Sequence, residues 1–144
     1  MSTDENKAVV RRLHKMLEDS WLTGDFSSMG DVFDQNVTSH IANMPPEVQG
    51  LQGFQQMMPM FRKAFPDFHF KVDHMLAEGD KVMYLIEWEG THKGELMGIP
   101  PTGKQVKVTD THIERIASGK IVERFGYFNV PLLMQQLGVS PSIM

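Results

Sequence analysis

The segment VKVTDTHIERIASGKIVERFGYFN, residues 106–129, constrains the fold more than any other part of the sequence. Apolar and polar side chains alternate along both of its halves, and a tight turn at Ala117–Lys120 separates them. Successive side chains of a strand point to opposite faces. The pattern therefore predicts a β-hairpin in which one face is more apolar than the other. That face carries two ionisable side chains, Asp110 and His112.

The register of this hairpin decides what surrounds the two ionisable residues. If Ala117 opposes Lys120 across the turn, His112 faces Phe125 and Asp110 faces Tyr127. Either this face is buried and its polar groups line a pocket, or the register differs and they are ordinary surface residues. In the same register two carboxylates, Glu114 and Glu123, face each other near the turn, and we expect both at the solvated rim. His112 alone, on an apolar strand face, is also compatible with a plain core role.

The first half of the chain has helical periodicity. Ser2 and Glu5 form a capping-box pattern, and apolar residues recur at helical spacing up to Trp21, before Gly24. A short helix is expected over residues 26–33, an extended stretch over 36–40, and an imperfect helix over 50–65 that Pro59 kinks or shortens.

From Phe68 onward the period changes to two, which predicts strands over residues 68–76, 81–92 and the hairpin, followed by a short helix that ends at Gly138. Helices followed by a meandering antiparallel sheet predict an α+β fold with helices packed on one face of a strongly curved sheet. A cavity between the two layers would be a natural ligand site. The length favours one domain spanning residues 1–144.

Composition disfavours several classes of function. The 14 basic and 18 acidic residues give a net charge of -4 with no basic run, so we expect no nucleic-acid partner. The absence of cysteine excludes disulfides and thiol nucleophiles. The amino terminus is polar and no apolar run reaches membrane-spanning length, so we expect a cytoplasmic protein without a membrane partner. Asp110 and His112 supply only two metal ligands, and no metal or cofactor is expected.

Five segments, taken together and in this order, resemble the SnoaL-like polyketide cyclase family of the nuclear transport factor 2-like superfamily. They are AFPDF (64–68), AEGDKV (77–82), GTHKGELMGIPPTGKQV (90–106), HIERIASGKIVE (112–123) and LLMQQLG (132–138). The resemblance implies an α+β cone-shaped barrel, usually dimeric, with a pocket inside the cone. It also implies ring closure of an aromatic polyketide ester by acid/base chemistry without metal or organic cofactor.

The resemblance carries over to three residues. The family histidine before the turn matches His112, and Trp21 and His40 correspond to the first-helix aromatic and to the histidine after the first strand. Gly126 and Asn129 stand where the family commonly has acids. Since an amide does not exchange a proton near neutral pH, Asp110 is our candidate for the missing carboxylate.

Two functions of different class follow. In the first, an enzyme acts on a small apolar or aromatic carbonyl compound by ring closure, isomerisation or hydrolysis, with Asp110 as proton acceptor and His112 as its polar partner. The side chains expected to contact the substrate are Trp21, His40, Phe125, Tyr127 and Asn129. In the second, the protein only binds the small molecule. Trp21 could instead be core, and His40 could be exposed and inert. A homodimer through the outward sheet face is expected in both.

Overall fold

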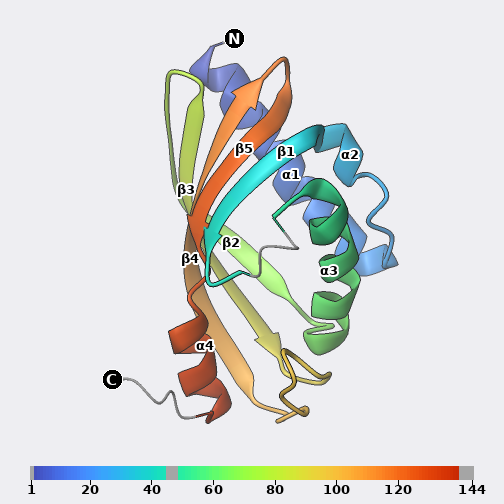
Figure 1. Ribbon diagram of the computed structural model, residues 1–144. Helices are drawn as coiled ribbons and strands as arrows, with labels where there is room; N and C mark the ends of the chain where they lie inside the picture. Colours follow the sequence, from blue (N-terminus) through green and yellow to red (C-terminus); the bar gives the residue numbers. More distant parts are fainter. Residues whose placement is uncertain (1, 45–48, 140–144) are drawn as a thin grey trace.

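The computed structural model describes residues 2–44 and 49–139. Its elements follow each other in this order: α1 (Thr3–Thr23), α2 (Met29–Val32), β1 (Phe33–Ala42), α3 (Leu51–Ala64), β2 (His69–Glu78), β3 (Lys81–Thr91), β4 (Gln105–Ala117), β5 (Lys120–Tyr127) and α4 (Val130–Leu137). Figure 1 shows a bent sheet with α1, α2 and α3 on its concave side and α4 beyond the end of β5. The α+β class and the curved sheet covered by helices are confirmed.

The strand order is β1-β5-β4-β3-β2, so β1 and β2 form the edges and the sheet is curved rather than closed. The pairs β2–β3, β3–β4 and β4–β5 are antiparallel, as the meander predicted. The prediction of a wholly antiparallel sheet is wrong, because β1 pairs parallel with β5. Strand direction at that edge depends on the long connection through α3 and three strands, which no local pattern encodes.

The register of the β4–β5 hairpin also differs from the prediction. Ala117 and Ile116 pair with Lys120 and Ile121 as expected, but an irregularity between Arg115 and Ile116 then shifts β5 by one residue. His112 therefore lies opposite Gly126, and Glu114 opposite Arg124. A one-residue shift turns every later side chain of β5 to the other face of the sheet.

The helices agree with their sequence signals. Ser2 and Glu5 form both hydrogen bonds of the capping box, and α1 ends at Gly24 in the left-handed conformation, which glycine adopts without strain. The second helix is shorter than the predicted 26–33, because Phe33 already begins β1. Pro59 lies inside α3 without ending it. Among the described residues, no helix combines the length and apolar character needed to cross a bilayer.

The last helix, α4, covers a strand edge that β5 leaves free. Beyond Tyr127 no strand of the described residues pairs with that side of β4, and the Gln136 side chain replaces the missing strand. The Lys107 backbone N–H donates to Gln136 Oε1 at 2.6 Å, and Gln136 Nε2 donates to the Lys107 carbonyl at 2.8 Å. Leu133 and Leu137 are buried in an apolar cluster with Val106, Val108 and other residues. This helix therefore closes the end of the sheet nearest to Asp110.

Candidate functional site

A cavity of about 130 Å³ lies between the concave face of the sheet and the helices α1 and α3. Its apolar walls are formed by Leu17, Trp21, Ile41, Met44, Phe54, Met57, Met58, Phe61, Phe68, Ile86, Trp88 and Phe128. Its polar groups are His14, Tyr84, Asp110, His112 and Arg124. An apolar engineered cavity of about 150 Å³ holds benzene, so a ring-sized compound is a suitable occupant. The methionines give the wall side chains that can move to admit a larger one.

Asp110 is the buried carboxylate of this cavity. Its Oδ2 accepts a hydrogen bond from Trp88 Nε1 at 2.9 Å, and its Oδ1 accepts one from the Asn129 backbone N–H at 2.9 Å. Burial raises the pKa of Asp110, and these two hydrogen bonds oppose that rise only in part. A carboxylate with a raised pKa is a stronger proton acceptor than an exposed aspartate.

His112 projects into the same cavity two residues further along β4. Its Nδ1 is fully buried without a hydrogen-bond partner in the described part of the chain. Burial, assisted by the charge of Arg124, lowers the pKa of His112 to about 4, so the ring is neutral at neutral pH. The ring lines the cavity, and Nε2 forms no hydrogen bond with any described residue. A ligand can therefore use Nε2 as a polar contact.

Gly126 sets the position of the His112 ring. A Cβ atom at residue 126 would lie 2.5 Å from His112 Nδ1 and 2.9 Å from the Thr111 carbonyl oxygen. Both separations are below normal contact distance, so only glycine leaves the ring where it is. Gly126 is therefore needed at this position because a larger residue would collide with the His112 ring.

We therefore expect Gly126→Ala to displace the His112 ring and to lower the free energy of unfolding by about 1–3 kcal/mol, the usual cost of overpacking. Urea unfolding would measure the stability, and the NMR signals of the His112 ring would report its displacement. Gly30→Ala is the matched control, because nothing lies within 4 Å of a Cβ built at that position. Unchanged His112 signals in Gly126→Ala would contradict the expectation.

A buried ion pair forms the next layer of the site. Arg124 donates through Nε to Glu114 Oε1 at 2.7 Å and through Nη2 to Oε2 at 2.9 Å, and the Tyr84 hydroxyl donates to Oε2 at 2.8 Å. Glu114 is completely buried, so its predicted place at the solvated rim is wrong. Burial alone would raise the pKa of Glu114, but the charge and hydrogen bonds of Arg124 lower it below its usual range. The pair is therefore ionised.

His14 approaches this ion pair from α1. It occupies the apolar stripe of the helix with Val10, Leu17 and Trp21, and its ring contacts that of Tyr84 edge-on at 4.7 Å. Burial lowers the pKa of His14 to about 4. Its Nε2 is buried without a partner among the described residues. The cavity thus contains two neutral histidines on facing walls.

The other predicted contact residues have different positions. Trp21 lines the cavity, and its Nε1 donates to the Phe65 carbonyl at 2.8 Å. Phe125 and Tyr127 do not line it, because the shifted register puts them on the outer face, opposite Ile113 and Thr111. The predicted pairing of Phe125 with His112 and of Tyr127 with Asp110 is therefore wrong.

His40 and Asn129 also lie outside the cavity wall. His40 is on the outer face, where its ring stacks on Phe125 at 5.0 Å and its Nε2 lies 2.9 Å from Glu123 Oε2. The Asn129 side chain caps α4 by accepting from the Leu132 N–H, and only its backbone N–H reaches Asp110. Asn129, whose side chain was expected to contact the substrate, instead orients the Asp110 carboxylate through its backbone N–H.

Sequence reasoning missed four polar or aromatic members of the site: His14, Tyr84, Trp88 and Arg124. For His14 a signal existed, since an ionisable residue within an apolar helix stripe is uncommon. For Arg124 the signal was the unfavourable facing of Glu114 and Glu123, because like charges directly opposite each other destabilise a sheet. A shift of one residue replaces that repulsion with two opposite-charge pairs.

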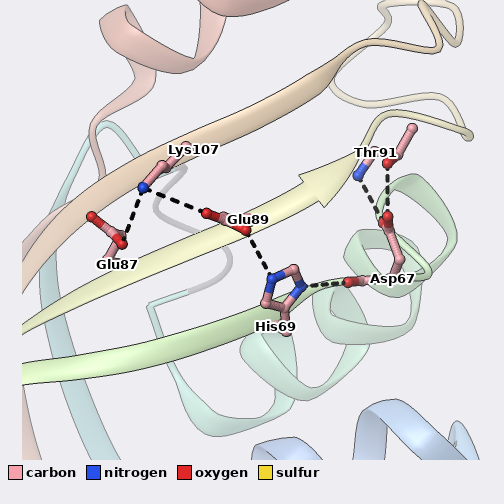
Figure 2. Close-up of polar contacts among 6 residues, drawn as sticks. All are labelled: Asp67, His69, Glu87, Glu89, Thr91 and Lys107. Carbon is pink, nitrogen blue, oxygen red and sulfur yellow. Dashed lines mark hydrogen bonds and ion pairs between the residues drawn. The ribbon is translucent and has the colours of Figure 1, made fainter.

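A second polar cluster lies on the outer face of the sheet and is shown in Figure 2. Its members are Asp67, His69, Glu87, Glu89, Thr91 and Lys107. His69 Nε2 lies 2.9 Å from Glu89 Oε2, and Lys107 Nζ lies 3.6–3.7 Å from Glu89 and Glu87. The hydrogen bond to the Asp67 carbonyl, assisted by Glu89, raises the pKa of His69. These exposed groups satisfy one another, which is typical of a surface network.

No group of three or more His, Asp or Glu side chains is arranged to hold a metal ion in residues 2–44 and 49–139. The polar groups in the cavity wall are one buried carboxylate, two neutral imidazoles, a phenol and a guanidinium.

Comparison with known proteins gives consistent results. The family model described as SnoaL-like polyketide cyclase matches residues 11–137. No curated protein sequence matches the chain significantly.

Solved structures resemble the whole fold. AclR from Streptomyces galilaeus, described as a candidate hydroxylase, is 29% identical with a TM-score of 0.80, and the match covers 97% of this chain and 100% of AclR. IdmH from Streptomyces antibioticus, a candidate polyketide cyclase, is 25% identical with a TM-score of 0.75, covering 93% and 99%. A SnoaL-like protein from Jannaschia sp. CCS1 is 20% identical with a TM-score of 0.80, covering 96% and 95%, and supports the fold alone.

Proposed function

The chain belongs to the SnoaL-like polyketide cyclase family, and from this premise we propose that it acts by acid/base chemistry on a small, largely apolar carbonyl compound bound in the internal cavity. The reaction class is enolate formation, which serves aldol cyclisation or isomerisation. The observation that carries the proposal is Asp110, a buried carboxylate with a raised pKa in a mostly apolar cavity.

In the proposed step a carbon next to the substrate carbonyl loses a proton to a carboxylate oxygen of Asp110. The electron pair of the broken C–H bond forms the C=C bond of an enolate, and the negative charge moves from Asp110 to the substrate oxygen. The net charge of the cavity does not change, so no additional charge has to be buried. His112, neutral at neutral pH, can donate a hydrogen bond to that oxygen through Nε2.

Hydrogen–deuterium exchange tests this function without knowledge of the natural substrate. 2-Indanone is a ring-sized ketone with exchangeable protons next to its carbonyl, and NMR in D₂O follows their loss. We expect the protein to accelerate exchange, and Asp110→Asn to slow the catalysed exchange by about 10²-fold, as is typical for loss of a general base. The control is His40→Gln, whose side chain lies on the outer face and should not matter.

One observation favours the second function, a binding protein without catalysis. Both oxygens of Asp110 already accept hydrogen bonds from N–H groups. One of these groups is the backbone N–H of Asn129, the residue directly before α4, so the carboxylate also has a structural role. If the protein bound 2-indanone but exchanged its protons no faster than buffer, this binding function would replace the enzymatic one.

We also propose a homodimer formed through the outer face of the sheet. Two rows of side chains cross this face: Met83, Ile113 and Phe125 in one, and Leu85, Thr111 and Tyr127 in the other. Met83 and Tyr127 are 41% and 46% exposed, which is high for large apolar side chains in contiguous rows. Phe128, which directly follows Tyr127, lines the cavity and does not belong to this face.

Sedimentation equilibrium at micromolar concentration should accordingly give twice the chain mass of 16.4 kDa. Ile113→Lys should give the monomer mass, since it places a charge in the middle of the face. Leu22→Lys is the control, because Leu22 is exposed on α1, which lies on the concave side of the sheet and not on its outer face (Figure 1). A wild-type monomer would refute the proposed interface.

A further inference from the structure

The guanidinium of Arg124 has more hydrogen-bond donors than its protein partners use. Of its five N–H groups, Glu114 takes one from Nε and one from Nη2. Tyr84 also lies within hydrogen-bonding reach of the guanidinium, so these two partners use at most three of the five N–H groups, and neither bond to Glu114 comes from Nη1. The fully buried polar atoms that lack a partner in that part of the chain are Asn6 Oδ1, His14 Nε2, His92 Nε2 and His112 Nδ1. Nη1 is not among them, so it keeps contact with accessible space.

That space is the cavity. Arg124 is only 6% exposed and lies in the cavity wall. The rings of Phe33 and Phe54 each lie with their centres 5.1 Å from the guanidinium carbon, and because those centres are only 5.8 Å apart, both rings pack against the same side of the group. Glu114 occupies the Nε/Nη2 edge. The Nη1 edge, which Glu114 leaves free, is therefore a part of the group that a ligand in the cavity can reach.

The charge around Arg124 suits a ligand oxygen without demanding an anion. Glu114 neutralises the guanidinium, and His14 and His112 are neutral at neutral pH. A carbonyl, hydroxyl or phenolate oxygen can accept from Nη1, and each such charge-assisted bond is stronger than one between neutral groups.

Arg124 also lies apart from the proton acceptor. It pairs with Glu114, which is four residues from Asp110 on the same strand, a separation of about 13 Å between Cα atoms. The His112 side chain lies between them along β4. The cavity thus has two polar ends, and one small ligand can contact both only through atoms on its opposite sides.

We propose that Arg124 is a ligand-binding residue whose Nη1 donates to an oxygen on the side of the ligand remote from the reacting carbon. The ligand class is then a ring compound with an oxygen substituent opposite its acidic C–H group. This inference deepens the proposed function and rests on it only in using the same cavity.

A matched pair of ligands tests the proposal. 5-Hydroxy-2-indanone carries a hydroxyl on the ring side opposite the carbonyl, and 2-indanone lacks it. Titration calorimetry at neutral pH would give both dissociation constants. We expect the wild-type protein to bind the hydroxylated compound about tenfold more tightly, the size of one hydrogen bond to a charged donor. Arg124→Lys keeps a cation beside Glu114 but lacks the planar fork, and should reduce that preference to about one.

Two further variants keep the test independent of folding and of catalysis. If Arg124→Lys does not fold, the double variant Arg124→Met/Glu114→Gln removes the donor without leaving a buried charge. Asp110→Asn should retain the tenfold preference, because it changes the other end of the cavity.

Equal binding of the two compounds by the wild type, no binding of either, or a preference that survives removal of Arg124 would overturn the inference. Accelerated exchange of 2-indanone without a hydroxyl preference would refute the inference and leave the proposed function intact. A preference for the hydroxylated compound without accelerated exchange would support the role of Arg124 and refute the proposed enzymatic function.

Discussion

Replacing Arg124 with methionine is expected to lower the free energy of unfolding by about 3–5 kcal/mol, the usual cost of removing one partner of a buried ion pair. Glu114 is 0% exposed and would keep only the Tyr84 hydroxyl as a partner. An unpaired carboxylate in this apolar setting must either remain charged without a counterion or bind a proton. Both outcomes cost free energy that the native pair avoids. Urea unfolding at neutral pH measures the loss.

The same two strands provide controls. Arg124→Met/Glu114→Gln should recover more than half of the loss, because the neutral amide can still accept from Tyr84 and no charge is buried. Arg115→Met breaks the neighbouring pair with Glu123, which is partly exposed on the outer face, and should cost no more than about 1 kcal/mol. If Arg124→Met and Arg115→Met were equally destabilising, the burial of the inner pair would not be what stabilises the fold.

Acidification from about pH 7.5 to about pH 5 is expected to destabilise the protein by about 4 kcal/mol through its two buried histidines. The pKa values of His14 and His112 are lowered from 6.5 to about 4 on folding, so the unfolded chain binds more protons between these values. The contribution of these two histidines is therefore complete above about pH 6.5, falls as the pH decreases, and stops falling below about pH 4. Each histidine contributes about 2 kcal/mol over this interval.

Other groups act with the opposite sign but weakly in this interval. The pKa of His69 is raised, so its contribution is present at low pH and is lost as the pH rises, yet the side chain is exposed. The raised pKa of Asp110 also favours the folded state at lower pH. Urea unfolding at the two pH values should show the net loss, and His14→Gln/His112→Gln should remove most of the difference. An NMR titration of His112 near its ordinary pKa would contradict its burial.

The sequence by itself determined the features that depend on near neighbours. The capping box at Ser2 and the apolar stripe up to Trp21 specify α1, because side chains three and four residues apart share one face of a helix. The alternation of apolar and polar side chains specified the strands. It also put Asp110 and His112 on one face of β4, because residues two apart in a strand share a face whichever strands pair with it. The α+β class follows from the order of these elements.

The tertiary structure decided what each strand lies beside. Alternation is preserved when a partner strand slips by one residue, so it cannot show that Gly126 rather than Phe125 faces His112, or that Arg124 rather than Glu123 joins Glu114. Facing like charges disfavour the unslipped register, but the actual slip also requires Arg124 to pack against Phe33 and Phe54, which come from β1 and α3. The parallel pairing of β1 with β5 also depends on residues distant in the chain, and so do the hydrogen bonds that Trp88 and Asn129 donate to Asp110. Registers, partners and cavities are set by burial and charge pairing among residues distant in the chain, and local periodicity carries no information about them.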